Sequence, residues 1–161
     1  MRCLVVYHSL SGTTRKVAQL AAKALDADVA EVRASRYGPG AVSYMRAAID
    51  SVFGKMPDIE ISGAASSSYD FVLLLAPVWA GHASTPMRAY LARNTGKIKR
   101  AAFVLTCGGH CPPKAYDEMA NLAAVKPDST YTLREKDIKA SSVLPPALAA
   151  FLSSVKLRQA A

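Results

Sequence analysis

The chain has 161 residues, of which 51% are hydrophobic and 20% charged, and its formal net charge at pH 7 is +8. This length supports one well-formed core and is short for two typical domains, so we expect residues 1–161 to form a single domain. The basic charge favours acidic partners or anionic cofactors. Because the basic residues form no aromatic-interleaved stripe and no helix-turn-helix pattern, we expect no nucleic-acid partner.

The distribution of apolar residues predicts neither a membrane-spanning segment nor a signal peptide. The longest apolar run, Phe71 to Ala80, is interrupted by Pro77 and is far too short to span a membrane. The first residues lack the longer apolar segment of a signal peptide. Cysteines stand at positions 3, 107 and 111, too few and too unevenly spaced for a disulfide framework. A cytoplasmic location is the resulting expectation.

The first predicted strand and helix are joined by a segment rich in hydroxyl groups. Residues 3–7 form an apolar run typical of a strand buried on both faces, and apolar residues then recur at helical spacing from Val17 to Leu25. The segment between them ends at a helix N-terminus, where free backbone N–H groups and the helix dipole favour an anion. We expect a phosphate to be bound by Ser9, Ser11, Gly12, Thr13 and Thr14. An ordinary N-cap by Thr13 or Thr14 is the alternative.

Predicted strands and helices alternate along the rest of the chain. We expect strands at 28–32, 71–76, 101–106 and 129–133, and helices at 42–53, from 86 to near 96, at 112–123 and at 145–155. Such alternation is typical of a parallel sheet covered by helices on both faces. Five strands fit the doubly wound order 2-1-3-4-5, in which ligands bind where the winding direction reverses. The segments 8–14, 77–86 and 107–113 would then meet at one edge.

Two common phosphate-binding motifs are missing. The chain has no Gly-x-Gly-x-x-Gly after the first strand and no Gly-x-x-x-x-Gly-Lys-Ser/Thr. The hydroxyl-rich segment instead resembles the first loop of the flavodoxin family, which has the form Thr/Ser-x-Thr/Ser-Gly-x-Thr and holds the phosphate of FMN. The resemblance implies an α/β fold, a flavodoxin-like doubly wound five-stranded parallel sheet with helices on both faces, and FMN as cofactor.

The segment after the third strand contains the only tryptophan, Trp79. The resemblance implies that this segment lies against one face of the flavin ring, where Trp79 would stack and Gly81 would let a peptide reorient toward flavin N5. Packing of the tryptophan at the sheet edge is the alternative. The residues expected to contact the flavin here are Pro77, Val78, Trp79, Ala80, Gly81 and His82.

The segment after the fourth strand would form the second loop around the flavin. Its expected flavin contacts are Cys107, Gly108, Gly109 and His110. Two consecutive glycines let the backbone pass close to a planar ligand. Many flavodoxins carry an aromatic residue in this loop, and this chain has none there, so the second stacking partner stays open.

A metal site and a thiol redox couple are rival interpretations of the same edge. His8, His82 and His110 each follow a predicted strand, and Cys107 and Cys111 lie beside them. Imidazole and thiolate are the usual ligands of zinc. The spacing Cys-x-x-x-Cys differs, however, from the Cys-x-x-Cys spacing common in zinc sites and in thioredoxin-like couples. We therefore expect no metal and two unreactive loop thiols.

Three functions remain open. An electron carrier would exchange electrons with a redox partner protein, whereas an NAD(P)H-dependent quinone reductase would serve a small-molecule acceptor; a flavin-free binding module is the third. Classical flavodoxins are typically acidic, and the net charge of +8 departs from that. Because Arg15, Lys16 and Arg88 are predicted on helices that begin at the flavin edge, we expect the reduced flavin to be stabilised and two-electron chemistry to be favoured.

Overall fold

The computed structural model describes residues 2–139 and 144–160. Its strands are β1 (Cys3–Tyr7), β2 (Asp28–Arg33), β3 (Glu60–Ser62), β4 (Phe71–Trp79), β5 (His82–Ala83), β6 (Ala101–Cys107) and β7 (Ser129–Arg134). Its helices are α1 (Thr13–Leu25), α2 (Ala41–Val52), α3 (Thr85–Arg93), α4 (Lys114–Ala123), α5 (Glu135–Lys139) and α6 (Pro146–Ala160), with a short 3₁₀ turn at Ser66–Ser68. No helix in these two ranges is long and apolar enough to cross a bilayer.

The strand order confirms the predicted topology and extends it. The sheet runs β3-β2-β1-β4-β6-β7, and the five strands from β2 to β7 in this order are parallel. These five are the predicted strands in the predicted order 2-1-3-4-5. Two short antiparallel strands were not expected: β3 pairs with β2 at the edge, and β5 forms a hairpin with β4. Strands of three and two residues are too short to show a hydrophobic period.

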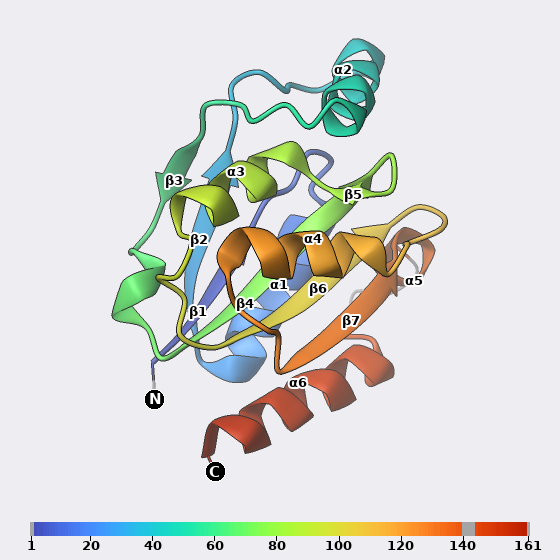
Figure 1. Ribbon diagram of the computed structural model, residues 1–161. Coiled ribbons are helices and arrows are strands. Elements are labelled where there is room, and N and C mark those ends of the chain that lie inside the picture. Colours follow the sequence, from blue (N-terminus) through green and yellow to red (C-terminus); the bar gives the residue numbers. More distant parts are fainter. Residues whose placement is uncertain (1, 140–143, 161) are drawn as a thin grey trace.

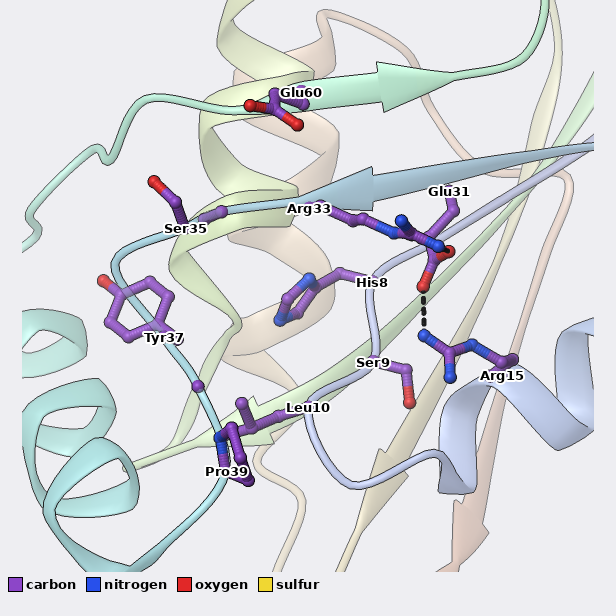
Figure 2. Close-up of a pocket in the computed structure, with 12 residues that line it drawn as sticks. His8, Ser9, Leu10, Arg15, Glu31, Arg33, Ser35, Tyr37, Pro39 and Glu60 are labelled. Carbon is purple, nitrogen blue, oxygen red and sulfur yellow. Dashed lines mark hydrogen bonds and ion pairs between the residues drawn. The ribbon is translucent and has the colours of Figure 1, made fainter.

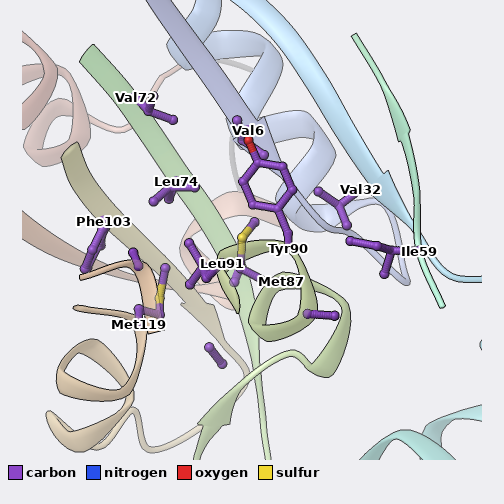
Figure 3. Packing of buried hydrophobic residues seen from close by; sticks show 14 of the residues in the cluster. Val6, Val32, Ile59, Val72, Leu74, Met87, Tyr90, Leu91, Phe103 and Met119 are labelled. Carbon is purple, nitrogen blue, oxygen red and sulfur yellow. The ribbon is translucent and has the colours of Figure 1, made fainter. Parts of the chain in front are cut away.

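Helices cover both faces of the sheet, with α3 and α4 on one side and α1 and α6 on the other (Figure 1). Alternate residues of each central strand serve the two sides, so Leu4 and Val6 of β1 face α3 and α4, and Val5 faces α1. Each side of the sheet has its own hydrophobic core. Figure 3 shows the core on the side of α3 and α4, where Met87 of α3 and Met119 of α4 pack against the sheet. Because both faces are covered, the inner strands β1, β4 and β6 are nearly continuous apolar runs.

Helix α2 is placed differently from the other helices. It lies beside the carboxyl edge of the sheet and stands away from the layers that sandwich the sheet (Figure 1). The helix itself was predicted from its apolar period, but the buried residues are Ala47, Asp50 and Ser51. Helix α5, which directly follows β7, was not predicted.

Candidate functional site

The three predicted segments lie at one edge of the sheet. The chain winds from β1 to β2 in one direction and then to β4 and β6 in the other, so the winding reverses between β1 and β4. Tyr7 at the end of β1 pairs with Leu75 of β4, and Pro77 of β4 pairs with Thr106 of β6. Segments that leave these three strands are therefore neighbours at the carboxyl edge, where doubly wound sheets bind ligands.

The segment after β1 forms a small open loop at the start of α1. Gly12 adopts a left-handed conformation with φ of 89°, and its N–H donates to the Ser9 hydroxyl over 3.1 Å. The Ser11 and Thr13 hydroxyls lie 3.2 Å apart and are partly or fully exposed. Gly12 is the N-cap, and no described side chain caps the helix, so the alternative of a Thr13 or Thr14 cap is wrong. The first amides of α1 and these hydroxyls can therefore receive an anion.

Thr14 does not share this exposed loop. Its side chain is 2% exposed, and its hydroxyl lies 2.7 Å from the Thr106 hydroxyl at the end of β6. Each hydroxyl is satisfied by the other, since either can donate. The Thr14 side chain thus joins two segments of the edge internally and is not available to a phosphate in this arrangement.

The cations expected near the flavin are engaged elsewhere. Arg15 forms an ion pair with Glu31, which Arg33 also contacts at 2.6 Å (Figure 2). Burial raises the pKa of Glu31, but hydrogen bonds from the two guanidinium groups outweigh it and lower the pKa below its ordinary value. Lys16 donates to the Ile138 carbonyl.

Arg88 is likewise neutralised by an acid. It is 8% exposed, lies 3.0 Å from Glu118 of α4 and donates to the Ser51 carbonyl over 3.1 Å. Together with the Arg15 pair, this removes much of the positive field that the sequence predicted at the site. The argument for stabilised reduced flavin loses its basis for Arg15 and Arg88, because paired charges act weakly at a distance. Glu31 is shared with Arg33 and a carbonyl does not neutralise Lys16, so part of the predicted positive charge remains.

The segment after the third predicted strand is a hairpin instead of an open loop. Strand β4 continues through Pro77 and Val78 to Trp79, and β5 begins at His82. Ala80 and Gly81 connect them with φ values of 49° and 83°. Positive φ at both central residues is the geometry of a two-residue hairpin turn, which lets pairing continue past the expected strand end.

Trp79 is packed inside the protein. It is 8% exposed, and its ring meets the ring of His8 at a centroid distance of 5.3 Å and that of Tyr37 at 5.1 Å, both edge to face. This arrangement favours the packing alternative over the expected stacking, because neither geometry leaves a broad free face. The Tyr37 hydroxyl donates to Asp50 of α2 over 2.9 Å and contacts the Thr85 hydroxyl at 2.8 Å.

Tyr37 was not singled out in the sequence. It falls in a stretch, 34–40, that is rich in turn residues and was expected to be a loop. Its contacts with Trp79, Asp50 and Thr85 join segments that are 13 to 48 residues apart. No local pattern could have indicated them.

The segment after β6 is open. Gly108, Gly109 and His110 are exposed, and nothing lies within 4 Å of a Cβ built at either glycine. Together with Arg134 and Lys136 they line a hollow of about 330 Å³. This hollow carries two cations that the sequence did not single out, because both follow β6 by more than twenty residues.

The thiols beside this loop are protonated. Cys107 is 3% exposed and donates to the Gly109 carbonyl over 3.4 Å. Burial and the neighbouring Cys111 raise the pKa of Cys107 to about 11, and burial also raises the pKa of Cys111. At neutral pH neither group is therefore the thiolate that nucleophilic chemistry requires.

The three histidines do not converge. His8 is 4% exposed, its Nδ1 donates to the Val32 carbonyl over 2.8 Å, and burial lowers its pKa. His82 contacts Glu118 at 3.3 Å, and His110 is exposed. In residues 2–139 and 144–160, no three His, Cys, Asp or Glu side chains are placed to hold a metal ion.

A second hollow of about 290 Å³ lies on the β2 side of the first loop (Figure 2). Buried His8 and the ion pair of Arg15 with Glu31 form part of its wall, and Tyr37 and Pro39 close it toward α2. The Nε2 atom of His8 is buried and has no hydrogen-bond partner among the described residues. This hollow was not expected, since the doubly wound rule points to the other side of β1.

Comparisons with known proteins agree with this topology. The structure is similar to a flavoprotein from Lactobacillus acidophilus NCFM crystallised in complex with FMN, with 24% identity and a TM-score of 0.71 over 81% of this chain and 92% of that one. A flavoprotein candidate from Bacteroides uniformis ATCC 8492 has 19% identity and a TM-score of 0.77 over 94% and 97% of the two chains. The chain has a flavodoxin-like fold.

A third similar structure is the apo form of an NADH:FMN oxidoreductase, with 15% identity and a TM-score of 0.57 over 98% of this chain and 88% of that one. No family model and no curated protein matches the sequence. At these identities the likeness concerns the flavodoxin-like fold. The expected fold class is confirmed, and the chemistry has to be argued from this chain's own residues.

Proposed function

We propose that this chain binds FMN and acts as a redox protein that transfers electrons through the bound flavin. The observation that carries the proposal is the partly exposed hydroxyl loop of Ser9, Ser11 and Thr13 at the start of α1, which no side chain caps, at the reversal between β1 and β4. A flavin phosphate needs backbone N–H donors, hydroxyl donors and a helix N-terminus, and this loop offers all three. The similar Lactobacillus acidophilus flavoprotein was crystallised with FMN.

The residues around the loop fit a planar cofactor on one side. Gly108 and Gly109 are exposed and would let the ring approach the backbone closely. The exposed Ala80 and the half-buried Gly81 form a turn that would face the ring from the other segment. Trp79 would support that turn from beneath, since its side chain is packed against His8 and Tyr37.

The chemistry would be supplied by the flavin, which accepts one or two electrons when bound. The protein's own part would be to bind the phosphate, to orient the ring and to limit access of water to it. Cations on Arg134 and Lys136 line the hollow beside Gly108, so an anionic ring or an acidic partner would be favoured there. Electrons would pass to a redox partner protein or to a small-molecule acceptor such as a quinone.

An NAD(P)H-dependent quinone reductase is the second candidate function. It is favoured by the similarity to the NADH:FMN oxidoreductase, which covers 98% of this chain. A carrier needs only an exposed flavin edge, whereas a reductase must also bind a nicotinamide cofactor next to the flavin.

Two measurements test the proposal in sequence. Titration of the purified protein with FMN and with riboflavin should show tighter binding of FMN, because only FMN carries the phosphate. Equal affinities, or no binding of either, would contradict the proposed site and favour a flavin-free binding module. Steady-state oxidation of NADH or NADPH with a quinone acceptor then distinguishes the functions, since a carrier shows no turnover without a separate reductase.

A further inference from the structure

Helix α2 buries small and polar residues and exposes apolar ones. Ala47, Asp50 and Ser51 are its buried residues. The opposite side is apolar and between 50% and 81% exposed, and it consists of Val42, Met45, Ile49, Val52 and Phe53, which we call the α2 stripe. The other large exposed apolar residues of the described chain are Tyr44 and Met56, which lie on or close to α2, and Val29, Ile61 and Leu157, which lie elsewhere. A contiguous apolar surface of this kind on a water-exposed helix indicates a partner.

Specific hydrogen bonds hold α2 in this orientation. Asp50 accepts hydrogen bonds from Arg36 and from the Tyr37 hydroxyl, and the pKa of Asp50 is lowered below its ordinary value, first by the Arg36 hydrogen bond. Ser51 donates to the Trp79 carbonyl over 2.7 Å, and its own carbonyl accepts from Arg88. Turning the stripe inward would break these bonds and expose buried charge. The stripe therefore stays outward until something covers it.

The spacing of the stripe fits a second helix as the covering surface. Val42, Met45, Ile49 and Val52 are separated by three, four and three residues. This is the a/d spacing with which one helix packs its side chains between those of another.

The same spacing is self-complementary. In an antiparallel pair of α2 helices centred at Ala47, Val42 lies opposite Val52 of the second copy, and Met45 lies opposite Ile49 of the second copy. The two-fold axis makes each of these contacts occur twice, once from each copy. An isologous dimer interface requires this symmetry.

Charge is compatible with self-association along this seam. The α2 stripe contains no charged residue, and Asp50 is already paired with Arg36. The cations nearest the seam are Arg46 and Lys55; in the antiparallel pair they lie opposite Ala48 and Pro39 of the second copy. The two copies of Arg46 lie about 3 Å apart along the helix axes and flank the same side of the seam, because residue 46 is one position from the centre. Arg46 is exposed, so the repulsion between the two guanidinium groups is screened by solvent and salt.

The area is sufficient for a specific, weak interface. Five apolar side chains that each lose about 100 Å² would bury roughly 1,000 Å² over the two copies, the lower limit for a specific interface. From these observations we propose that the α2 stripe is the surface on which a second copy of this chain docks, as an antiparallel pair of α2 helices. The dimer would brace the Trp79 segment of each copy through Ser51.

Sedimentation equilibrium of the wild-type chain and two matched variants tests the surface. We expect a dimer at about 100 µM, because an interface at the small end of the specific range belongs with weak, transient complexes that need a high concentration to form. Ile49→Arg should weaken it about tenfold or more, since it buries an unpaired charge at the seam. Leu157→Arg on α6, where Leu157 is 73% exposed, should change nothing. A monomeric wild-type chain, or an Ile49→Arg variant that dimerises like wild type, would overturn the proposal.

Disulfide trapping tests the antiparallel direction. In a Cys111→Ser background, a mixture of Val42→Cys and Val52→Cys chains should cross-link under mild oxidation, whereas Val42→Cys alone should not. In the antiparallel pair the two copies of residue 42 are about 15 Å apart at 1.5 Å per residue, beyond the reach of a disulfide. Efficient trapping of Val42→Cys with itself would overturn this arrangement. Flotation of a monomeric wild-type chain with anionic phosphatidylglycerol vesicles would assign the stripe to a lipid surface and also overturn it.

Discussion

The hydroxyl groups of Thr14 and Thr106 lie 2.7 Å apart and are buried between the start of α1 and the end of β6. The two residues are 92 positions apart in the chain. Their contact joins the segment that follows β1 to the segment that follows β6. It therefore supports the candidate phosphate loop from below without entering it.

Thr14→Val is expected to lower stability and to leave phosphate recognition unchanged. The substitution keeps the shape of the side chain but leaves the Thr106 hydroxyl buried without a partner, which costs about 1 to 3 kcal/mol of unfolding free energy. Urea denaturation measures this loss. The double variant Thr14→Val/Thr106→Val should recover part of it, because both polar groups are then removed. If Thr14→Val changes the ratio of FMN affinity to riboflavin affinity, the Thr14 hydroxyl contacts the phosphate and the prediction is wrong.

Ser11→Ala and Thr13→Ala are expected to weaken FMN binding and to affect riboflavin much less. Each hydroxyl would donate to a charged phosphate, and such a bond is worth about 1.5 to 3 kcal/mol, or roughly tenfold or more in affinity. Fluorescence titration with both ligands measures the difference. Ser35→Ala is the matched control, since Ser35 lines the hollow on the other side of β1. Equal losses for FMN and riboflavin would contradict the assignment of the loop.

Trp79 provides a test between packing and stacking. Trp79→Ala should cost about 3 to 5 kcal/mol of unfolding free energy, as expected for a large side chain removed from a core. Trp79→Phe should retain FMN affinity within a few-fold, because the buried ring offers no free face to the flavin. If a well-folded Trp79→Phe protein loses FMN binding, the ring stacks on the flavin after all and the segment must rearrange on binding.

His8 should make stability depend on pH in the weakly acidic range. Burial lowers its pKa below the ordinary value of 6.5, so the unfolded chain binds a proton that the folded chain does not. The free energy of unfolding should therefore fall as pH drops below about 6.5, by at most about 1.4 kcal/mol per pH unit. Urea denaturation of wild type and His8→Gln between pH 7.5 and pH 5 measures this, and His8→Gln should have the shallower slope.

Glu31 titrates in a more acidic pH range than His8, so a Glu31 variant serves as a control for the His8 prediction. Its pKa lies below the ordinary value of 4.5, so its stabilising contribution is complete above that pH and is lost only under more acidic conditions. Glu31→Gln should not make the slope between pH 7.5 and pH 5 shallower, because loss of the Glu31 charge, which raises the pKa of His8, only makes His8 harder to protonate in the folded chain. Identical slopes for wild type and His8→Gln would show that His8 is not the group that titrates.

The central sheet and its order follow from patterns that are local in the chain. Continuous apolar runs such as Phe71 to Ala76 are buried on both faces, and helical periods such as Val17 to Leu25 bury one side, so each element is readable within ten or so residues. Alternation of strand and helix then leaves few topologies, because parallel crossovers are right-handed. The hydroxyl loop at the start of α1 is also local, since one glycine and four hydroxyl residues stand together.

The tertiary structure decided which way these groups face and what they contact. The period of α2 predicts an apolar side but cannot say that Asp50 and Ser51 are anchored to Arg36 and Trp79 so that this side points outward. The Thr14 hydroxyl contacts Thr106 and the Arg15 side chain pairs with Glu31. Both partners are distant in the sequence and come close only in the folded sheet. The periodicity of a sequence shows the spacing at which apolar residues recur within one element. Burial and side-chain pairing depend instead on contacts between elements that are far apart in the chain.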